Sequence, residues 1–424
     1  SEEISRVAKQ VREISPRIGL ILDTQGTKIR VTNVTEAFPV KDIVCISSTK
    51  EDSQYLEISY PEIHKIVTIG TRILLDDGTI ELKVKEIKDT KVYCETIQEG
   101  MLKPNKTVNI PDIPLSFPIL TEKDKQDIHY AIKNDYDFIS VSFVRNVSDI
   151  YAVREIIGNS DIKIIAKIEN RESLEHIDEI IKAVDATMIA RGDLGVETSL
   201  WNIPIIQKQV IYKCRAAGKP VIVATQLLES MRENKKPTRA EVSDVSNAIM
   251  DGADSVMLSA ETSTGKNPVE AVDTINKIAL NTEKFMQPTI VYGETDSPRE
   301  VDELAKSIFS LSNSIPLKAV IILSNNPYTI GSISRHRPNV PIWSISSSVK
   351  RIRQDSIYWG IISQHVEDLP EDRDEALFKA ILTVYTFGEL ALTDKIAIIT
   401  GSSIKNKEND LVLEIATTKD ILDK

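Results

Sequence analysis

The sequence predicts an α/β protein: a (β/α)₈ barrel of the TIM type, with an inserted all-β domain and a C-terminal α/β domain. Two observations lead to this prediction. From residue 115 to about residue 285, short apolar runs alternate with amphipathic helical patterns at the spacing of βα units. Polar and charged residues collect at the C-terminal ends of these runs, which is the end at which such a barrel carries its chemistry.

The apolar runs predict parallel strands, because runs that are apolar throughout are typical of strands buried on both faces of a sheet. A doubly wound sheet would also bind ligands at the carboxyl ends of its strands, but at a single crevice. Here polar and charged residues follow several consecutive strands, which favours the barrel. A complete barrel has eight strands. Six are predicted here: Gly19–Thr24, Phe138–Phe143, Ile162–Ile168, Ala186–Ala190, Val221–Thr225 and Asp254–Ser259.

The other domains follow from changes in the pattern. After residue 24 the helical period gives way to β-type alternation, as at Ile80–Ile87, with a turn at Asp76–Gly78. We expect this domain to be inserted after the third barrel strand, and a new alternation of strands and helices begins after residue 290. The predicted divisions are a first barrel segment at 1–24, an inserted β-barrel domain at 25–114, a second barrel segment at 115–287 and a C-terminal α/β domain at 288–424.

Composition excludes several classes of function. The chain has 424 residues, with 52 Lys and Arg against 63 Asp and Glu, a formal net charge of −11. Because no basic run offsets this charge, we expect no binding to nucleic acid or to an anionic membrane. No apolar stretch approaches a membrane span, the polar N-terminus does not read as a signal peptide, and three widely spaced cysteines support neither disulfides nor a zinc site. We expect a cytoplasmic protein.

Lys167 and Glu169 stand at the end of the run Ile162–Ile168. Alternation places both side chains on one side of a strand, about 6–7 Å apart along it. An isolated Lys-x-Glu pair is more often a surface ion pair. Here the preceding apolar residues indicate a buried strand, where unpartnered charges are costly, so we expect both side chains to act in a site on the barrel axis.

The segment Arg191–Gly195 supplies a second carboxylate. The backbone at Gly192 can approach a ligand closely, and Asp193 can join Glu169 in binding a divalent cation, with water and substrate oxygens completing the shell that Mg²⁺ prefers. A turn in which Asp193 caps the next helix is the simpler interpretation. Thr225, at the end of the next run, adds either a hydroxyl to the site or a packed strand residue.

Taken in order, these segments resemble the pyruvate kinase family: LDTQGTKIR, SFVR, IIAKIEN, ARGDLG, VATQLLESM, PTRAEVSDVSNAI, DGADSVMLS and AET. The resemblance implies a glycolytic phosphotransferase that moves the phosphoryl group of phosphoenolpyruvate to ADP, giving ATP and pyruvate. It also implies that the inserted domain is a lid, that the C-terminal domain is regulatory, and that the protein is a homotetramer.

The resemblance assigns roles to individual residues. Lys167 would stabilise the moving phosphoryl group, a task suited to a fixed point charge, and Thr225 would lie near the enolate carbon that is protonated. Glu169 and Asp193 would hold Mg²⁺ or Mn²⁺, and Arg30 would contact the nucleotide phosphates. The residues implied to bind phosphoenolpyruvate are Lys167, Gly192, Asp193 and Thr225; Ser142 and Glu261 would line the site.

The monovalent-cation site departs from the family pattern. Asp23 and Thr24 match two of the family's ligands, but Lys28 stands where Glu is common. In the family, Lys at this position accompanies independence from K⁺, and its ammonium group is a compact charge that can replace the ion. We therefore expect that K⁺ is not required. A solvent-facing lysine in the hinge is the alternative.

Other interpretations stay open at this stage. The family begins with two further barrel strands and a substrate-gripping Arg-x-Asn-x-Ser-His-Gly segment that this sequence does not contain. A shortened, catalytically impaired barrel could act as a binding or assembly subunit, and a metal held by Glu and Asp would also suit a lyase. Ser324–Pro327 lacks the usual effector loop, so fructose 1,6-bisphosphate is not expected; Arg335–Arg337 could bind another phosphorylated effector, or form a solvated helix end.

Overall fold

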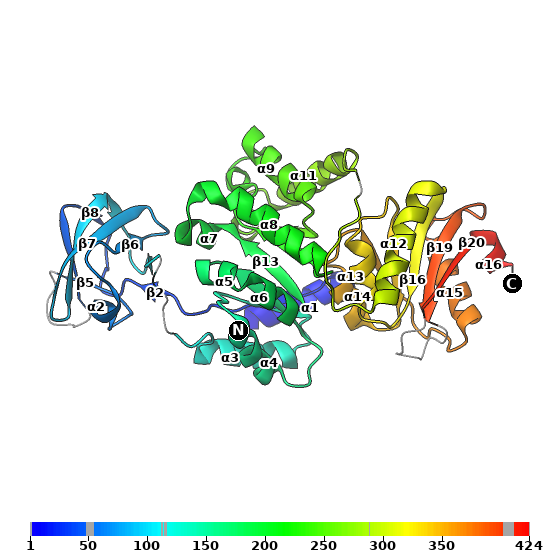
Figure 1. Ribbon diagram of the computed structural model, residues 1–424, viewed down its shortest axis with the longest axis horizontal. Helices are drawn as coiled ribbons and strands as arrows, with labels where there is room; N and C mark the ends of the chain where they lie inside the picture. The colour runs from blue at the N-terminus through cyan, green and yellow to red at the C-terminus, as the bar shows by residue number, and fades with distance from the viewer. Residues whose placement is uncertain are drawn as a thin grey trace.

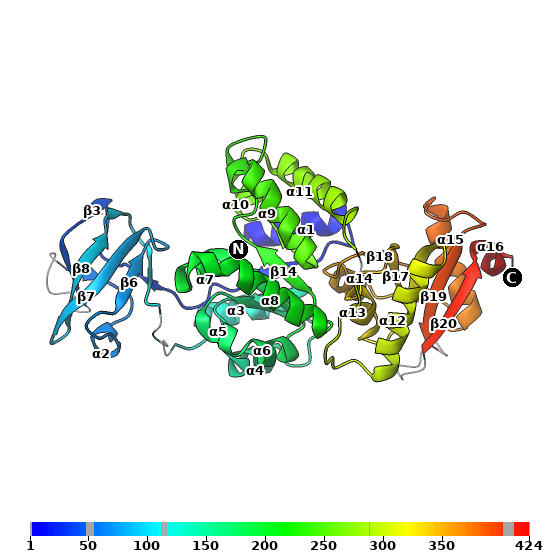
Figure 2. The same cartoon turned by 45° about the horizontal axis from the view of Figure 1, so that its top comes forward.

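The computed structural model describes residues 2–47, 55–111, 113, 117–287, 289–401 and 411–423. The chain forms a β-rich inserted unit, a central unit and a C-terminal unit, which follow one another along the long axis of the molecule (Figure 1). In the turned view of Figure 2 the inserted unit, with β6, β7 and β8, lies at one end of the molecule beside the central unit.

The central unit is built on a parallel sheet with its strands in sequence order, β1-β11-β12-β13-β14-β15. Strands that follow one another in this way, with helices between them, form the wall of a (β/α) barrel. All six predicted strands are present among the described residues, and β1 and β15 are the edges of the sheet there. The strands are β1 (Ile21–Asp23), β11 (Phe138–Val141), β12 (Lys163–Ile168), β13 (Ala186–Ala190), β14 (Val221–Ala224) and β15 (Ser255–Met257).

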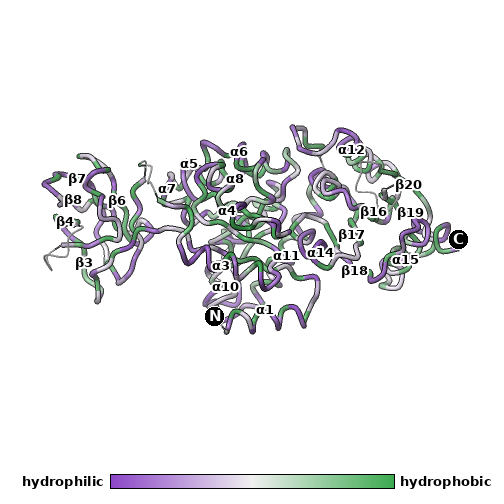
Figure 3. Tube along the Cα trace, turned by 90° about the horizontal axis from the view of Figure 1, so that it is seen from below, coloured by the Kyte–Doolittle hydropathy of each residue, from purple (hydrophilic) through white to green (hydrophobic). Residues whose placement is uncertain are grey.

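The helices of the central unit begin where the sequence supplies caps. The Thr238 hydroxyl accepts a hydrogen bond from the Glu241 backbone, and the Glu241 carboxylate accepts one from the Thr238 backbone, a capping box. Apolar residues concentrate in the strands at the centre of this unit (Figure 3). The helices are α1 (Glu2–Ile14), α3 (Glu122–Lys133), α4 (Val147–Ile157), α5 (Arg171–Glu175), α6 (Ile177–Ala183), α7 (Arg191–Glu197), η1 (Leu200–Asn202), α8 (Ile203–Ala216), η2 (Glu229–Arg232), α9 (Arg239–Asp251), α10 (Ala260–Ser263) and α11 (Pro268–Glu283).

The inserted unit is a twisted sheet in the order β2-β10-β6-β7-β8-β4-β5, with a small pair β3-β9 beside it. The predicted alternation is real, since Ile80, Leu82 and Val84 are buried on one face of β7. The predicted turn Asp76–Gly78 joins β6 to β7. The elements are β2 (Ile29–Arg30), β3 (Phe38–Val40), β4 (Ile43–Ser47), β5 (Leu56–Glu57), α2 (Ile63–Ile66), β6 (Arg72–Leu75), β7 (Ile80–Lys88), β8 (Lys91–Gln98), β9 (Gly100–Leu102) and β10 (Thr107–Asn109).

The C-terminal unit is a sheet in the order β18-β17-β16-β19-β20, in which β20 is antiparallel to β19. Helices cover the sheet on both faces, which gives an α/β sandwich. The elements are α12 (Arg299–Ser314), β16 (Leu317–Leu323), α13 (Thr329–Ser334), β17 (Ile342–Ser346), α14 (Val349–Asp355), β18 (Ile361–His365), α15 (Arg373–Thr386), β19 (Lys395–Gly401), β20 (Leu411–Thr417) and α16 (Thr418–Leu422).

The segment Arg335–Arg337 corrects a sequence prediction. Its three residues are only 3%, 0% and 3% exposed, so they form neither a solvated helix end nor an open effector site. Arg335 pairs with Asp302, and Arg337 Nη1 lies 2.8 Å from Asp254 Oδ1 in the central unit. These charges are buried because they join the C-terminal unit to the central unit.

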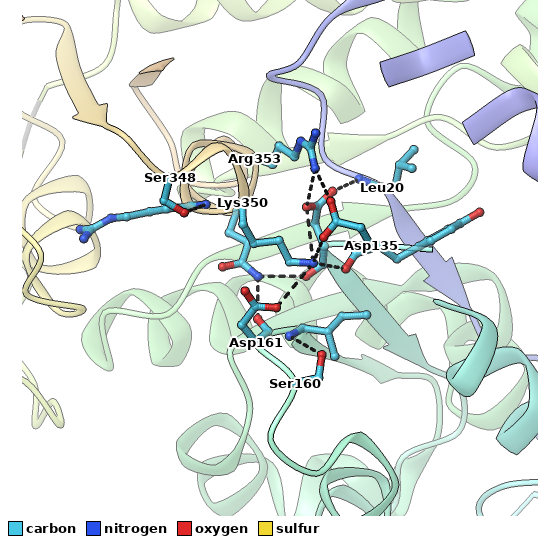
Figure 4. Close-up of polar contacts among 12 residues, drawn as sticks. Leu20, Asp135, Ser160, Asp161, Ser348, Lys350 and Arg353 are labelled. Atoms are coloured by element: carbon cyan, nitrogen blue, oxygen red, sulfur yellow. Dashed lines mark hydrogen bonds and ion pairs between the residues drawn. The ribbon is translucent and has the colours of Figure 1, made fainter. Parts of the chain in front are cut away.

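A second charged contact joins the same two units at the start of β11. Lys350 and Arg353, on α14, reach Asp135 at 2.9 and 2.8 Å (Figure 4). The fully buried Asp137 accepts hydrogen bonds from the Leu20 backbone and from Arg12, both at 2.7 Å. These contacts with the C-terminal unit therefore lie at the amino ends of the central strands, opposite the carboxyl ends at which the site is expected.

All three cysteines lie in described segments, and none forms a disulfide. Burial raises the pKa of the Cys94 and Cys214 thiols to about 12, and burial also raises that of Cys45. Among the described residues, no helix combines the length and the apolar character that crossing a bilayer would require.

Candidate functional site

The charged residues predicted for the site meet at the carboxyl ends of β1, β11, β12 and β13. Lys167 Nζ lies 3.0 Å from Glu169 Oε1 and 3.3 Å from Asp23 Oδ2, and it donates a hydrogen bond of 3.0 Å to Ser142 Oγ. Strand alternation explains the first contact, because Lys167 and Glu169 are two positions apart. Asp23 and Ser142 arrive from neighbouring strands, because parallel strands end at the same edge of a sheet.

Lys167 is a fixed positive charge. Its side chain is 12% exposed. Burial acts to lower the pKa of the Lys167 ammonium, but the negative charges of Glu169 and Asp23 outweigh burial, and the pKa is raised above its ordinary value. The group therefore keeps its proton at neutral pH, which suits it to attract an anion rather than to act as a base.

Glu169 is fully buried and only partly satisfied. Its Oε2 accepts a hydrogen bond of 2.8 Å from the Phe143 backbone, whereas Oε1 has no hydrogen-bond donor besides the ion pair with Lys167. Burial raises the pKa of this carboxyl; Lys167 works against the rise, and the charge of nearby Asp193 adds to it. A cation bound between Glu169 and Asp193 would offset the repulsion between their two negative charges.

The residues fit a hard divalent cation. In the described part of the chain, no three side chains of His, Cys, Asp or Glu converge on a point that could hold a metal. Mg²⁺ does not need such a cage, because it is commonly held by one or two carboxylates together with water and substrate oxygens. The unsatisfied Oε1 of Glu169 and the carboxylate of Asp193 match that donor set.

Thr225 and Gly192 form the next part of the site. The Gly192 backbone donates a hydrogen bond of 2.8 Å to Thr225 Oγ1. Thr225 and Gln226 have φ values of +70° and +55°, in the left-handed region. This conformation is unfavourable for a β-branched residue and is found mainly where the surroundings enforce it, often at functional sites.

Arg191 enforces that conformation, and sequence reasoning missed it. Its buried guanidinium donates hydrogen bonds of 2.9 Å and 3.2 Å to the carbonyls of Thr225 and Gln226. Asp244, on α9, holds the guanidinium in place at 2.7 Å. Arg191 and Asp244 occur in the ARGDLG and PTRAEVSD segments, but nothing local in either segment indicates that the two pair.

Thr24 and Lys28 occupy places that the sequence did not predict. The Thr24 hydroxyl accepts a hydrogen bond of 3.0 Å from the Ser142 backbone, so it ties β1 to the end of β11. Lys28 Nζ lies 3.1 Å from Asp193 Oδ1 and 4.7 Å from the centre of the Phe143 ring. The ion-pair partner of Lys28 is therefore Asp193, the carboxylate expected to bind a divalent cation. Asp23 instead contacts Lys167.

Arg30 lies apart from these residues. It belongs to β2 in the inserted unit, where its guanidinium donates a hydrogen bond of 2.9 Å to the Asn105 carbonyl. A contact that the sequence analysis missed links that unit to the site: Asn109 Nδ2 donates to Glu197 Oε1 at 2.8 Å. Glu197 ends α7, the helix that also carries Asp193.

Two cavities lined by described residues open between the inserted and central units. Their volumes are about 590 and 1440 Å³, and both are lined by Lys28, Asp193 and Glu197. The first is lined by apolar residues of the connecting segments and by Phe143 on one part, and by polar and charged residues of the central unit, such as Arg171 and Glu172, on another. The second runs between the Asp77–Gly78 turn and η1. Lys28 and Asp193 thus border a space large enough for more than one small ligand.

The family follows from a comparison with known proteins. Residues 1–272 match the model of the pyruvate kinase barrel domain, and residues 302–414 match that of the pyruvate kinase alpha/beta domain. The chain belongs to the pyruvate kinase family.

Relatives named pyruvate kinase match nearly the whole chain. The protein of Geobacillus stearothermophilus is 35% identical over 440 residues, covering 100% of this chain and 75% of the relative. That of Clostridium perfringens is 36% identical, covering 97% and 90%, and that of Staphylococcus aureus strain MRSA252 is 37% identical, covering 94% and 70%. The site is therefore expected to catalyse the pyruvate kinase reaction.

Proposed function

We propose that this member of the pyruvate kinase family transfers the phosphoryl group of phosphoenolpyruvate to ADP, giving ATP and pyruvate, in glycolysis in the cytoplasm. The observation that carries the proposal is the buried ammonium of Lys167, 3.0 Å from Glu169, beside a second carboxylate at Asp193. A phosphoryl group in transfer spreads negative charge over its oxygens, so catalysis depends on positive charge held in position.

Each residue has a role in this reaction. Lys167 attracts the phosphoryl oxygens, and its contacts with Asp23 and Ser142 keep it in place beforehand. Glu169 and Asp193 would hold Mg²⁺ or Mn²⁺, which supplies charge neutralisation for the phosphate oxygens. The backbone at Gly192 faces Thr225 and leaves room for the substrate carboxylate.

Thr225 is suited to the protonation of the enolate. Its oxygen already accepts the hydrogen bond from Gly192. A hydroxyl group that accepts in this way still has its own proton to donate. Thr225 can donate that proton to the enolate carbon and regain one from solvent, or it can position a water molecule that is the immediate donor.

The inserted unit would act as the lid over this site. We place the domains at 1–24, 25–114, 115–287 and 288–424, and the separate apolar cores of the three units support these divisions. Arg30 would contact the nucleotide phosphates when the lid moves, since β2 lies next to the connecting segment.

Other features of the proposal concern ions and partners. The tethered ammonium of Lys28 at the site supports activity without K⁺. Exposed apolar side chains on α8, α9 and α11, among them Tyr212, Met250 and Val272, support a homotetramer. A phosphorylated effector other than fructose 1,6-bisphosphate would have to bind the C-terminal unit outside Arg335–Arg337, because these residues are buried.

Pyruvate formation from phosphoenolpyruvate with Mg²⁺ and ADP, with and without K⁺, tests the proposal. The Lys167→Met variant should lose turnover by about a thousandfold, as expected when a preorganised charge is removed, while its affinity for ADP stays close to that of the wild type. Lys163→Met is the matched control, because Lys163 lies at the other end of β12 and pairs with Asp185.

The outcomes separate the possible functions. Turnover that depends on ADP and not on K⁺ would support the phosphotransferase and the role of Lys28. Pyruvate release from phosphoenolpyruvate without ADP would mean that the phosphoryl group passes to water, which would contradict the phosphotransferase. A lyase would release pyruvate from an aldol substrate and would leave phosphoenolpyruvate unchanged with or without ADP. Binding of ADP without any turnover would favour the catalytically impaired binding or assembly subunit, and equal loss of turnover and ADP affinity in Lys167→Met would contradict the role of Lys167.

A further inference from the structure

Two lysines reach the carboxylates of the site, and they are held very differently. Lys167, in β12, pairs with Glu169, the residue directly after that strand, with side chains 12% and 1% exposed. Lys28 and Asp193 pair across two units of the protein, with side chains 26% and 28% exposed. The first pair is shielded from water. The second pair is partly exposed, so another cation can replace the lysine at its carboxylate.

The surroundings of Lys28 form a site for a cation. Its ammonium lies 3.1 Å from Asp193 Oδ1 and 4.7 Å from the centre of the Phe143 ring, which attracts a positive charge through its π face. The backbone N–H of Phe143 is also the group that holds Glu169 Oε2. The ammonium therefore contacts elements that position both carboxylates assigned to the divalent metal.

We propose that Lys28 is a tethered cation that competes with the divalent metal for Asp193, so that the metal has to displace its ammonium group from that carboxylate in order to bind. The proposal rests on the proposed function only in taking Asp193 as a metal ligand. It concerns the strength of metal binding, and it is separate from any substitution for K⁺.

The energetics favour displacement of Lys28 and retention of Lys167. A partly exposed ion pair changes an equilibrium by a factor of about five, because water and ions screen it. A divalent cation carries twice the charge of an ammonium group and can replace it there. The buried pair cannot be opened in the same way, since separating its partners would leave an uncompensated charge in the interior.

Displacement would also loosen the inserted unit. Lys28 lies in the segment that leads into β2, and Asn109, at the end of β10, contacts Glu197. Both contacts end on α7, so the two segments that join the inserted unit to the central unit are held by one helix. Metal binding would release the first contact and leave the second, which couples metal binding to the freedom of the lid.

Binding of Mn²⁺ to the full-length protein, without substrate or nucleotide, tests the proposal. The free ion is measured by electron paramagnetic resonance. We expect Lys28→Met and Lys28→Gln to bind Mn²⁺ up to about fivefold more tightly than the wild type, which is the factor associated with a partly exposed pair. The control is Lys88→Met, which removes an equal charge from the inserted unit. Among the described residues, Lys88 forms an ion pair only with Glu86. The Mn²⁺ affinity of this variant should match that of the wild type.

A second measurement uses the wild type alone. Mild acetylation followed by peptide mass spectrometry reports how accessible each lysine amine is. Added Mg²⁺ should increase the modification of Lys28 and leave that of Lys88 unchanged. This measurement does not depend on whether a variant folds.

Equal or weaker Mn²⁺ binding by the Lys28 variants, or equal tightening in Lys88→Met, would overturn the proposal. Unchanged or reduced modification of Lys28 in the presence of Mg²⁺ would also count against it. Because neither measurement requires turnover, a chain that forms no pyruvate but shows these effects would contradict the proposed function and leave the competition at Asp193 intact.

Discussion

Thr225 combines a strained backbone with a hydroxyl that the proposed reaction uses. Thr225→Ala removes the acceptor for Gly192 and the proton available to the enolate, so we expect kcat for pyruvate formation to fall about a hundredfold, the usual effect of losing a general acid. Thr225→Ser keeps the hydroxyl and removes the β-branch, so it should retain most of the turnover. Steady-state kinetics check this prediction. Equal losses in both variants would assign the effect to the strained turn and not to the hydroxyl.

Residues two apart on a strand could be placed from the sequence, and residues joined across the fold could not. Alternation alone put Lys167 and Glu169 on one face of β12. Lys28 and Asp193 are 165 positions apart, and Arg191 and Asp244 are 53 apart. No local pattern encodes such pairs, because they depend on where the inserted unit and α9 come to lie.

At the scale of elements, α7 and α9 are held to the end of β14 by the buried guanidinium of Arg191, whose ion-pair partner Asp244 is partly exposed. Arg191 binds two carbonyls after β14 and pairs with Asp244 on α9. Arg191→Met would leave both carbonyls and the carboxylate without their donor. We expect the free energy of unfolding to fall by about 2–3 kcal/mol, because two backbone carbonyls lose their donor, and denaturant titration measures it. Asp244→Asn should lower the free energy of unfolding by less, since Asp244 is 37% exposed. An equal loss would mean that the whole effect of Arg191→Met comes from the ion pair.

The strands of the central unit were predictable because each is an unbroken apolar run between helical patterns. β13 has the predicted bounds, and the other strands of the central unit are one to three residues shorter, since strand ends depend on sheet pairing. Arg335–Arg337 was predicted wrongly for a related reason. A short run of basic residues is usually solvated, and its burial here follows from acidic partners at Asp302 and Asp254 that are distant in sequence.

At the scale of the whole molecule, the joint between the central and C-terminal units makes stability sensitive to acid. Burial, reinforced by the charge of Arg335, lowers the pKa of His336 to about 4. Since an unfolded histidine has a pKa of about 6.5, the unfolded chain takes up a proton that the native protein refuses as the pH falls from about 6.5 to 4. The stabilisation is therefore complete above this window and is lost within it.

We expect the His336 contribution to lower the free energy of unfolding by about 2 kcal/mol between pH 7 and pH 5. Urea titrations at the two pH values measure the loss. His336→Gln should lose less between the same two values, whereas His129→Gln, at an exposed position, should behave like the wild type. If the loss in His336→Gln equals that in the wild type, another group is responsible.

The three cysteines have a practical consequence for following the lid. A thiol reacts as its thiolate, and the pKa of about 12 that burial gives Cys94 and Cys214 leaves almost none of that form at neutral pH. Cys45 is also partly buried, with a raised pKa. New cysteines at Asp77, on the turn of the inserted unit, and at Ser199, across the larger cavity, can therefore carry a pair of fluorescent dyes in a chain in which Cys45 is replaced by Ser, because burial protects Cys94 and Cys214 from labelling. With that one replacement, the chain provides a low labelling background for measuring, in single molecules, the distance between the inserted and central units.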